Sequence, residues 1–159
     1  MAANLSFDVT FTYSDKADGI SIPTALIFGE KIAYTYAKVD TGAEYCIFSQ
    51  EIGLKLGLDI ESGIPKRMGS LTGTLDTFGH EVTLQTFDIA FQSIIYFARY
   101  PELSRNLLGR NGWMRHFSQL SLITRPSSTY RNTSEILTLS CTESVISHDQ
   151  FLGHYFRAY

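Results

Sequence analysis

A polar segment separates two apolar segments in the first third of the chain. Ile32 to Val39 carries apolar or aromatic groups on both faces of an extended chain, which predicts a strand buried on two sides. Cys46-Ile47-Phe48 predicts a second buried strand. Between them stands Asp40-Thr41-Gly42-Ala43. Burying a charge is costly, so a carboxylate between two buried strands is a candidate functional residue. The alternative is an ordinary turn, because Asp and Gly are both frequent in turns.

The residues before Asp40 predict a hairpin that brings the carboxylate to a strand end. Ile20 to Phe28 predicts one strand, Gly29-Glu30-Lys31 a tight turn, and Ile32 to Val39 the partner strand. Upstream, apolar side chains alternate from Leu5 to Tyr13, which predicts an amphipathic strand that ends in a turn at Asp15 to Gly19.

A short helix is predicted after the second apolar strand. Ser49 is placed to cap Gln50 to Leu56, and Gly57 follows the last helical residue. Ile52 and Leu56 are spaced to share a buried face.

Gly63 to Ala90 predicts a long hairpin with two candidate tips. One is Met68-Gly69-Ser70-Leu71-Thr72-Gly73, where glycine permits positive φ and an easy hinge. The other is Asp76-Thr77-Phe78-Gly79. Alternation from Val82 to Phe91 predicts one half-covered strand, and Ile94 to Ala98 predicts the next.

A second motif lies two-thirds along the chain, at Asn106-Leu107-Leu108-Gly109-Arg110. Two large apolar residues followed by Gly predict a strand that passes close beneath another backbone. Gly112 to Phe117 predicts a short helix or a turn. Leu120 to Thr124 and Ile136 to Cys141 predict a hairpin.

The last residues change from strand to helix periodicity. Ser147 and Gln150 match a capping box. Five apolar residues then fall on one helical face: Phe151, Leu152, Tyr155, Phe156 and Tyr159. We favour a helix that packs on its own domain over one that binds a partner or a second copy.

The two motifs together resemble those of the retropepsin-like aspartic proteases, the single-domain relatives of the retroviral proteases. That pattern is an apolar strand, Asp-Thr/Ser-Gly-Ala, a Gly-rich flap, and two apolar residues with Gly and Arg followed by Asp or Asn. All occur in this order between about residues 21 and 122. The resemblance implies an all-β fold, a closed β-barrel or sandwich with a flap hairpin and one or two short helices. The pattern does not require the C-terminal helix, which we expect from its periodicity alone. Chain length predicts one domain over residues 1–159, with a retropepsin-like core of about 20–125 and a C-terminal hairpin and helical extension of about 126–159.

By resemblance the chain is an aspartic endopeptidase that hydrolyses extended peptides or proteins. The chemistry needs two carboxylates and the chain has one Asp-Thr-Gly, so the catalytic Asp40 would come from each subunit of a homodimer. The Thr41 hydroxyl would bind the backbone of the opposite subunit. Gly42 would permit the tight turn and close approach of substrate, and Ala43 completes the tetrapeptide.

Further roles follow from the same resemblance. The flap would be Gly69, Ser70, Leu71, Thr72 and Gly73. Structural support would come from Glu44, Leu107, Leu108, Gly109 and Arg110, with Glu44 and Arg110 as an ion pair that stabilises the dimer. Ser70 and Thr72 depart from the most Gly-rich flaps. The alternatives are a catalytically inactive peptide-binding module of the same fold and a structural dimer scaffold.

Composition excludes several other classes. A net charge of −3 without a basic stripe argues against nucleic-acid binding. We expect no secretory signal at the N-terminus and no membrane span. Two distant cysteines, Cys46 and Cys141, do not make a disulfide scaffold and fit a cytoplasmic protein, with Cys46 a small buried hydrophobe. The four histidines lack metal-site spacing, so we expect neither metal nor cofactor.

Overall fold

The computed structural model describes residues 9–14, 19–70, 73–101, 103, 105–124 and 134–141. The helix expected over residues 147–159 and the first residues of the strand expected from Leu5 lie outside the described residues. The predicted division into a core and an extension therefore stays a prediction.

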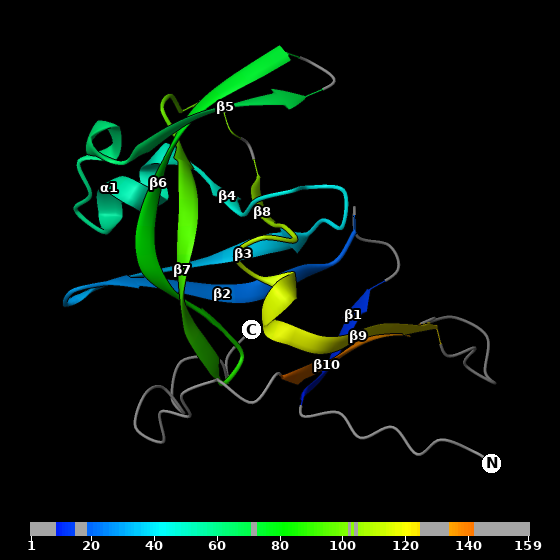
Figure 1. Ribbon diagram of the computed structural model, residues 1–159. Coiled ribbons are helices and arrows are strands. Elements are labelled where there is room, and N and C mark those ends of the chain that lie inside the picture. Colours follow the sequence, from blue (N-terminus) through cyan, green and yellow to red (C-terminus); the bar gives the residue numbers. More distant parts are fainter. Residues whose placement is uncertain are drawn as a thin grey trace.

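Six strands close into a barrel (Figure 1). In order of pairing they are β2 (Ser21–Phe28), β3 (Lys31–Val39), β8 (Asn106–Leu108), β4 (Ile47–Phe48), β7 (Ile89–Ala98) and β6 (Gly73–Thr86). Pairing of β2 with β6 completes the ring, and β5 (Ile64–Ser70) adds to the free side of β6. The β3–β8 and β4–β7 pairs are parallel, and the other pairs are antiparallel. The predicted all-β closed barrel is confirmed.

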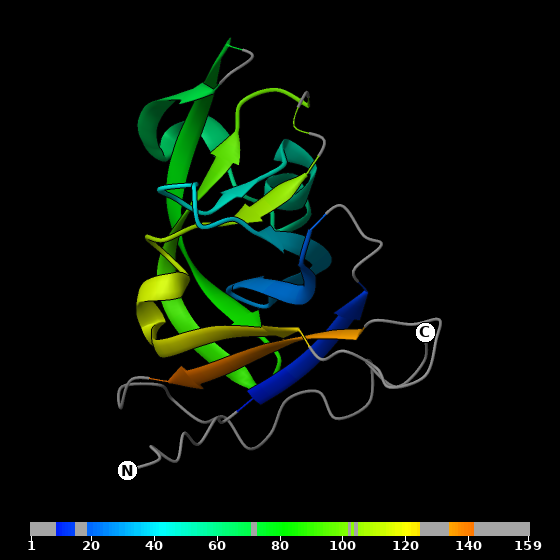
Figure 2. The same cartoon turned by 90° about the vertical axis from the view of Figure 1, so that its right-hand side faces the viewer.

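A separate sheet of three antiparallel strands lies at the end of the molecule away from the β5–β6 hairpin (Figures 1 and 2). Its strands are β1 (Val9–Ser14), β10 (Ser134–Cys141) and β9 (Phe117–Thr124), with β10 in the middle. The predicted hairpin of residues 120–124 with 136–141 is confirmed, and β9 begins earlier, at Phe117. The ring of Phe11 lies 5.3 Å from that of Phe87, so the β6–β7 turn contacts this sheet.

Within the described ranges, three short helical segments accompany the strands. They are α1 (Gln50–Lys55), η1 (Ile60–Ser62) and η2 (Met114–His116). Ile52 and Leu56 are buried as predicted. Gly57, which follows the end of α1, has a φ angle of +74°. The prediction that the Ser49 side chain caps α1 is wrong, because it makes no cap hydrogen bond. The Ser49 N–H instead donates to the Asn106 side chain.

One face of β3 is open, which corrects the prediction of a strand buried on both sides. Ala33 and Ala37 face the core, whereas Tyr34 and Tyr36 are 44% and 61% exposed. Aromatic residues on alternate positions led to the wrong prediction, since burial depends on what covers a face, and the described residues leave both tyrosines exposed.

The structure corrects two further predictions, one for the β6–β7 connection and one for the tip of the long hairpin. The strand expected from Val82 to Phe91 is broken at Phe87 and Asp88, where Phe87 takes φ of +56°. The second candidate tip lies inside β6. Gly79 is required there by a close approach, because a Cβ atom on it would lie 2.9 Å from the Tyr96 ring.

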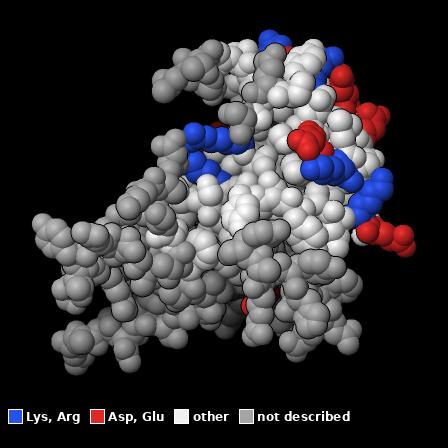
Figure 3. Space-filling view, turned by 180° about the vertical axis from the view of Figure 1, so that it is seen from behind, with Lys and Arg blue, Asp and Glu red and all other residues white. Residues whose placement is uncertain are grey.

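Charges of both signs alternate on the side that carries α1 and the β2–β3 turn (Figure 3). Glu30 and Lys31 are exposed in the turn, and Lys55 and Glu51 form an exposed ion pair of 2.8 Å on α1. Within the described ranges no helix is long and apolar enough to cross a membrane.

Trp113 is the largest fully buried side chain, and its indole N–H donates to the buried Thr86 hydroxyl over 3.1 Å. Trp113→Phe leaves a cavity and an unpaired hydroxyl, so we expect a loss of about 2–4 kcal/mol in the free energy of unfolding. Urea denaturation at fixed protein concentration measures it. The control Tyr36→Phe, on the open face of β3, changes the value by less than about 0.5 kcal/mol. Equal midpoints for the two variants would contradict this account of the core.

Candidate active site

Asp40 stands where β3 ends beside β8. Val39 pairs with Leu108 in parallel register, and the Asp40 N–H donates to the Leu108 carbonyl over 3.0 Å. Leu108 is fully buried, Leu107 is partly buried and Asp40 is partly exposed. The barrel therefore anchors the backbone of Asp40 while its side chain remains at the surface of a single chain.

The Asp40 carboxylate is held by the turn that it begins. Its Oδ1 atom accepts hydrogen bonds from the N–H groups of Gly42, at 2.9 Å, and Ala43, at 3.3 Å. No described residue donates to Oδ2. These are the bonds of an ordinary Asx turn, so the turn that we weighed as an alternative is present. It also fixes one carboxylate oxygen and leaves the other available.

The loop of residues 40–46 between β3 and β4, called the Asp40 loop here, is joined to the segment after β8 by backbone hydrogen bonds. The Arg110 N–H donates to the Ala43 carbonyl over 3.0 Å, and the Asn111 N–H donates to the Glu44 carbonyl over 2.7 Å. A Cβ atom on Gly109 would lie 2.3 Å from the carbonyl oxygen of Tyr45. The close approach predicted at Gly109 is confirmed.

Cys46 packs beneath this junction. Its side chain is fully buried, and Sγ accepts a hydrogen bond from the Gly109 N–H at 3.3 Å. Burial raises the pKa of the thiol to about 12, against a smaller lowering by the backbone hydrogen bond to Gly109. Cys46 is therefore a neutral buried group, as predicted, and not a nucleophile.

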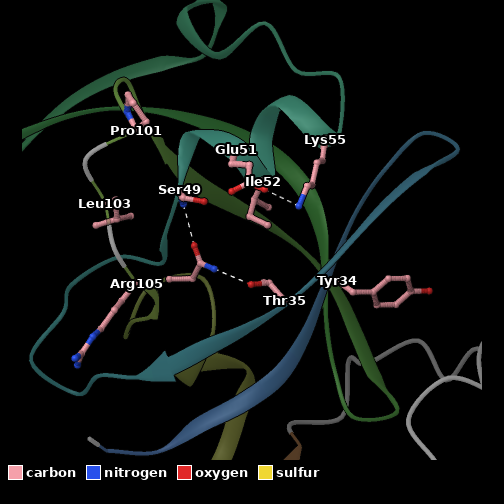
Figure 4. A pocket seen from close by; sticks show the side chains of 10 residues that line it. Tyr34, Thr35, Ser49, Glu51, Ile52, Lys55, Pro101, Leu103 and Arg105 are labelled. Carbon is pink, nitrogen blue, oxygen red and sulfur yellow. Dashed lines mark hydrogen bonds and ion pairs between the residues drawn. The ribbon is translucent and has the colours of Figure 1, made fainter. Parts of the chain in front are cut away.

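Asn106 fastens β8 to two other elements, and dashed lines in Figure 4 mark its hydrogen bonds to the labelled Thr35 and Ser49. Its Nδ2 donates to Thr35 Oγ1 on β3 over 2.8 Å, and its Oδ1 accepts from the Ser49 N–H over 2.9 Å. It borders a hollow of about 310 Å³ between β3, α1 and the segment before β8. We did not single it out from the sequence. The only local signal for this role is a side-chain amide at the start of a strand that we expect to be buried, because a buried amide group needs hydrogen-bond partners.

The β5–β6 hairpin extends over the side of the barrel where the Asp40 loop lies (Figures 1 and 2). Ser70 pairs with Gly73 next to the tip, which agrees with the first of the two predicted tips. Leu71 and Thr72 lie outside the described residues. Neither Gly69 nor Gly73 has an atom within 4 Å of where a Cβ would be.

Two cation contacts hold the base of this hairpin. Arg67 donates to Asp76 across the strands over 2.7 Å, and this hydrogen bond lowers the pKa of the Asp76 carboxyl. The Lys66 ammonium donates to the Tyr45 hydroxyl over 2.9 Å, which links β5 to the Asp40 loop. Neither Lys66 nor Tyr45 was a site residue in our reading of the sequence, because their separation of 21 positions gives no local pattern.

The remaining predicted site residues are exposed. Thr41, Glu44 and Arg110 lie on the surface of the single chain. No ion pair joins Glu44 to Arg110 within the described part of the chain. Across the same ranges, no three metal-ligating side chains gather at one place.

The closed barrel, the Asp40 loop against β8 and the β5–β6 hairpin define a retropepsin-like fold. The chain is similar to the crystal structure of a retropepsin-like aspartic protease from Rickettsia conorii, with a TM-score of 0.54 and 16% identity. That match covers 82% of this chain and 98% of the other. EIAV protease complexed with the inhibitor HBY-793 matches with a TM-score of 0.48 and 16% identity, over 62% and 88% of the two chains. No protein-family model matches the sequence, and no curated protein matches it.

Gly109→Ala tests the junction between β8 and the Asp40 loop. The added methyl collides with backbone atoms of Tyr45, which cannot rotate away, so we expect a loss of about 1–3 kcal/mol in the free energy of unfolding. The matched control is Gly69→Ala, where the methyl meets open space and the change is below about 0.5 kcal/mol. Thermal and urea unfolding measure both. Equal stability of the two variants would show that the close approach at Gly109 is not a constraint.

Proposed function

We propose that the protein is an aspartic endopeptidase whose catalytic pair is Asp40 from each subunit of a homodimer. The observation that carries the proposal is the setting of Asp40 in a retropepsin-like fold. It ends β3 beside Leu108, and the amides of Gly42 and Ala43 hold one oxygen of its carboxylate.

The dimer follows from the number of carboxylates. General acid–base hydrolysis of a peptide bond without a metal needs two of them, and the chain has one Asp-Thr-Gly. A two-fold axis beside Asp40 would bring two copies together. Thr41, exposed in the single chain, would then hydrogen-bond the partner's backbone. Arg110 and Glu44, both exposed next to Asp40, would add charge contacts at the same interface.

The chemistry requires that the paired carboxylates share one proton, because two adjacent negative charges repel each other. The ionised member takes a proton from a water bound between them, and the protonated member donates to the carbonyl oxygen of the substrate. Attack of the water gives a tetrahedral diol. The member that took the water proton then gives it to the peptide nitrogen, while the other carboxylate takes a proton from one hydroxyl of the diol. The C–N bond breaks to give an acid and an amine, and the pair again shares one proton.

Substrate would lie extended between the Asp40 pair and the β5–β6 hairpin, which would act as a flap. An extended peptide can pair its backbone with strands on both sides. Gly69 and Gly73 stand next to the tip, where a Cβ atom on either would meet no atom within 4 Å, and the conformational freedom of glycine suits a hinge. Apolar residues such as Leu71 would contribute pockets for apolar side chains. We also propose a cytoplasmic location, which the scarcity of cysteine favours.

Asp40→Asn tests the catalytic assignment. The amide cannot serve as a general base, so cleavage of casein or of a peptide library should fall by roughly 10²–10⁴-fold at every pH between acidic and neutral. Asn keeps the size of the side chain, and equal unfolding midpoints would show that the variant is folded. Cleavage equal to that of wild type would overturn the mechanism. Wild-type protein that binds peptides but never cleaves them would instead favour the inactive binding module.

A mixing experiment tests the shared site. When wild type is mixed with an equal amount of Asp40→Asn chains and the subunits exchange, roughly one quarter of dimers keep two aspartates. Activity should fall to about half of what the same amount of wild-type chain shows before mixing, because about half of the wild-type chains then lie in mixed dimers. An unchanged activity would mean that each chain works alone. Analytical ultracentrifugation should show a dimer under the same conditions, and a monomer at micromolar concentrations would contradict the proposal.

A further inference from the structure

Lys66, Tyr45 and Tyr96 form a cluster between the hairpin and the Asp40 loop, defined here as the Lys66 cluster. Lys66 lies on β5, Tyr96 on β7, and Tyr45 five positions after Asp40. The Lys66 Nζ atom lies 4.1 Å from the centroid of the Tyr45 ring and 5.9 Å from that of Tyr96. The two rings meet edge to face at 5.1 Å. Three elements from distant parts of the chain thus converge on one ammonium group.

The contacts of this cluster fix the position of a positive charge. Tyr96 is buried, and Tyr45 and Lys66 are partly buried. The hydrogen bond from Nζ to the Tyr45 hydroxyl raises the pKa of Lys66, so the amine stays charged throughout the physiological range. It is therefore an ion-binding group and not a neutral amine nucleophile. A side chain that is already ordered loses less entropy when it binds an anion.

Among the described residues, no carboxylate forms an ion pair with this charge. The ion pairs within the described ranges are Lys55–Glu51, Arg67–Asp76 and Arg99–Glu61, and none includes Lys66. Glu44 acts on it only at longer range. An ammonium has three N–H donors, and the Tyr45 hydroxyl accepts one of them. The remaining N–H groups of Lys66 can therefore donate to an anionic oxygen of a ligand.

The cluster adjoins the loop that carries Asp40, because Tyr45 follows Asp40 by five positions. An extended segment of five residues spans at most about 17 Å, which limits how far Tyr45 can lie from Asp40. A bound peptide that ran from the Asp40 pair beneath β5 would therefore come near the Lys66 cluster within a few residues. Alternate side chains of that peptide face the same wall, so one of them can be directed at Nζ.

We propose that the Lys66 cluster makes this protein select peptides that carry an aspartate or glutamate a few residues from the cleaved bond. The inference rests on the proposed endopeptidase function and adds a substrate class to it. In a symmetric dimer each subunit contributes one cluster, so an acidic side chain is favoured on either side of the bond.

The test compares peptides that differ only by Glu or Gln. A peptide-library digest first locates a cleaved bond, and Glu or Gln is then placed at each of the positions up to about five residues away on both sides. At pH 6 and low salt, we expect wild-type kcat/KM to be roughly five- to tenfold higher for Glu than for Gln at one position on each side. The preference should disappear below about pH 4, where glutamate of the peptide is protonated.

Variants assign the effect to this lysine. Lys66→Gln should cleave the Glu and Gln peptides equally, Lys66→Glu should prefer Gln, and Lys66→Arg should keep the preference for Glu. Lys55→Gln removes an exposed lysine on α1 and should behave as wild type. If Lys66→Gln does not fold, the comparison of Glu and Gln peptides with wild type and with Lys66→Arg still tests the proposal. Wild type that cleaves Glu and Gln peptides equally at all positions overturns this proposal and leaves the endopeptidase intact.

A binding measurement separates failure of this proposal from failure of the proposed function. Fluorescence anisotropy with the same labelled peptides and the inactive Asp40→Asn chain should show several-fold tighter binding of the Glu peptide. If wild type never cleaves but binds Glu peptides more tightly, the proposed selectivity for acidic peptides is retained and the proposed endopeptidase activity is rejected. Equal binding without cleavage would reject both.

Discussion

At Gly109 the chain passes so close to Tyr45 that a Cβ atom would lie 2.3 Å from its carbonyl oxygen. This approach lets the amides of Arg110 and Asn111 reach the carbonyls of Ala43 and Glu44. Those bonds hold the loop that carries Asp40. The parallel β3–β8 pair anchors the same loop at its start. The position of the carboxylate therefore depends on a contact that only glycine allows.

The same constraint explains why part of the site could be predicted from the sequence. Asp40 at a strand end and Gly109 after two apolar residues are local signals, and each has a physical reason that needs no knowledge of distant neighbours. The buried face of α1, with Ile52 and Leu56, is of the same kind. Exposure of Tyr34 and Tyr36 was not predictable in this way, because a strand pattern shows which residues share a face but not what covers it. Phe87 adopts positive φ without the glycine that usually marks such a turn.

Residues that join distant segments gave no local signal at all. Asn106 binds Thr35 and Ser49, which are 71 and 57 positions away. Pairing of β1 with β10 joins the first and last described strands. Lys66 and Tyr45 meet because β5 and the Asp40 loop lie on the same side of the barrel. In each case the strand topology brings the partners together, and the spacing of the residues along the sequence does not encode that topology.

The contacts of the hairpin divide it into a held base and an open end. Thr77 donates to the Lys66 carbonyl over 2.8 Å, Arg67 pairs with Asp76, and Lys66 binds Tyr45, all on the base side of Gly69. Beyond this point a Cβ atom on Gly69 or Gly73 would meet no atom within 4 Å. A flap that bends beyond Arg67 would leave the Lys66–Tyr45 hydrogen bond and the Asp40 loop in place. Entry of substrate would then not disturb the carboxylate, and the charge that we propose for selecting substrate would keep its distance from the cleaved bond.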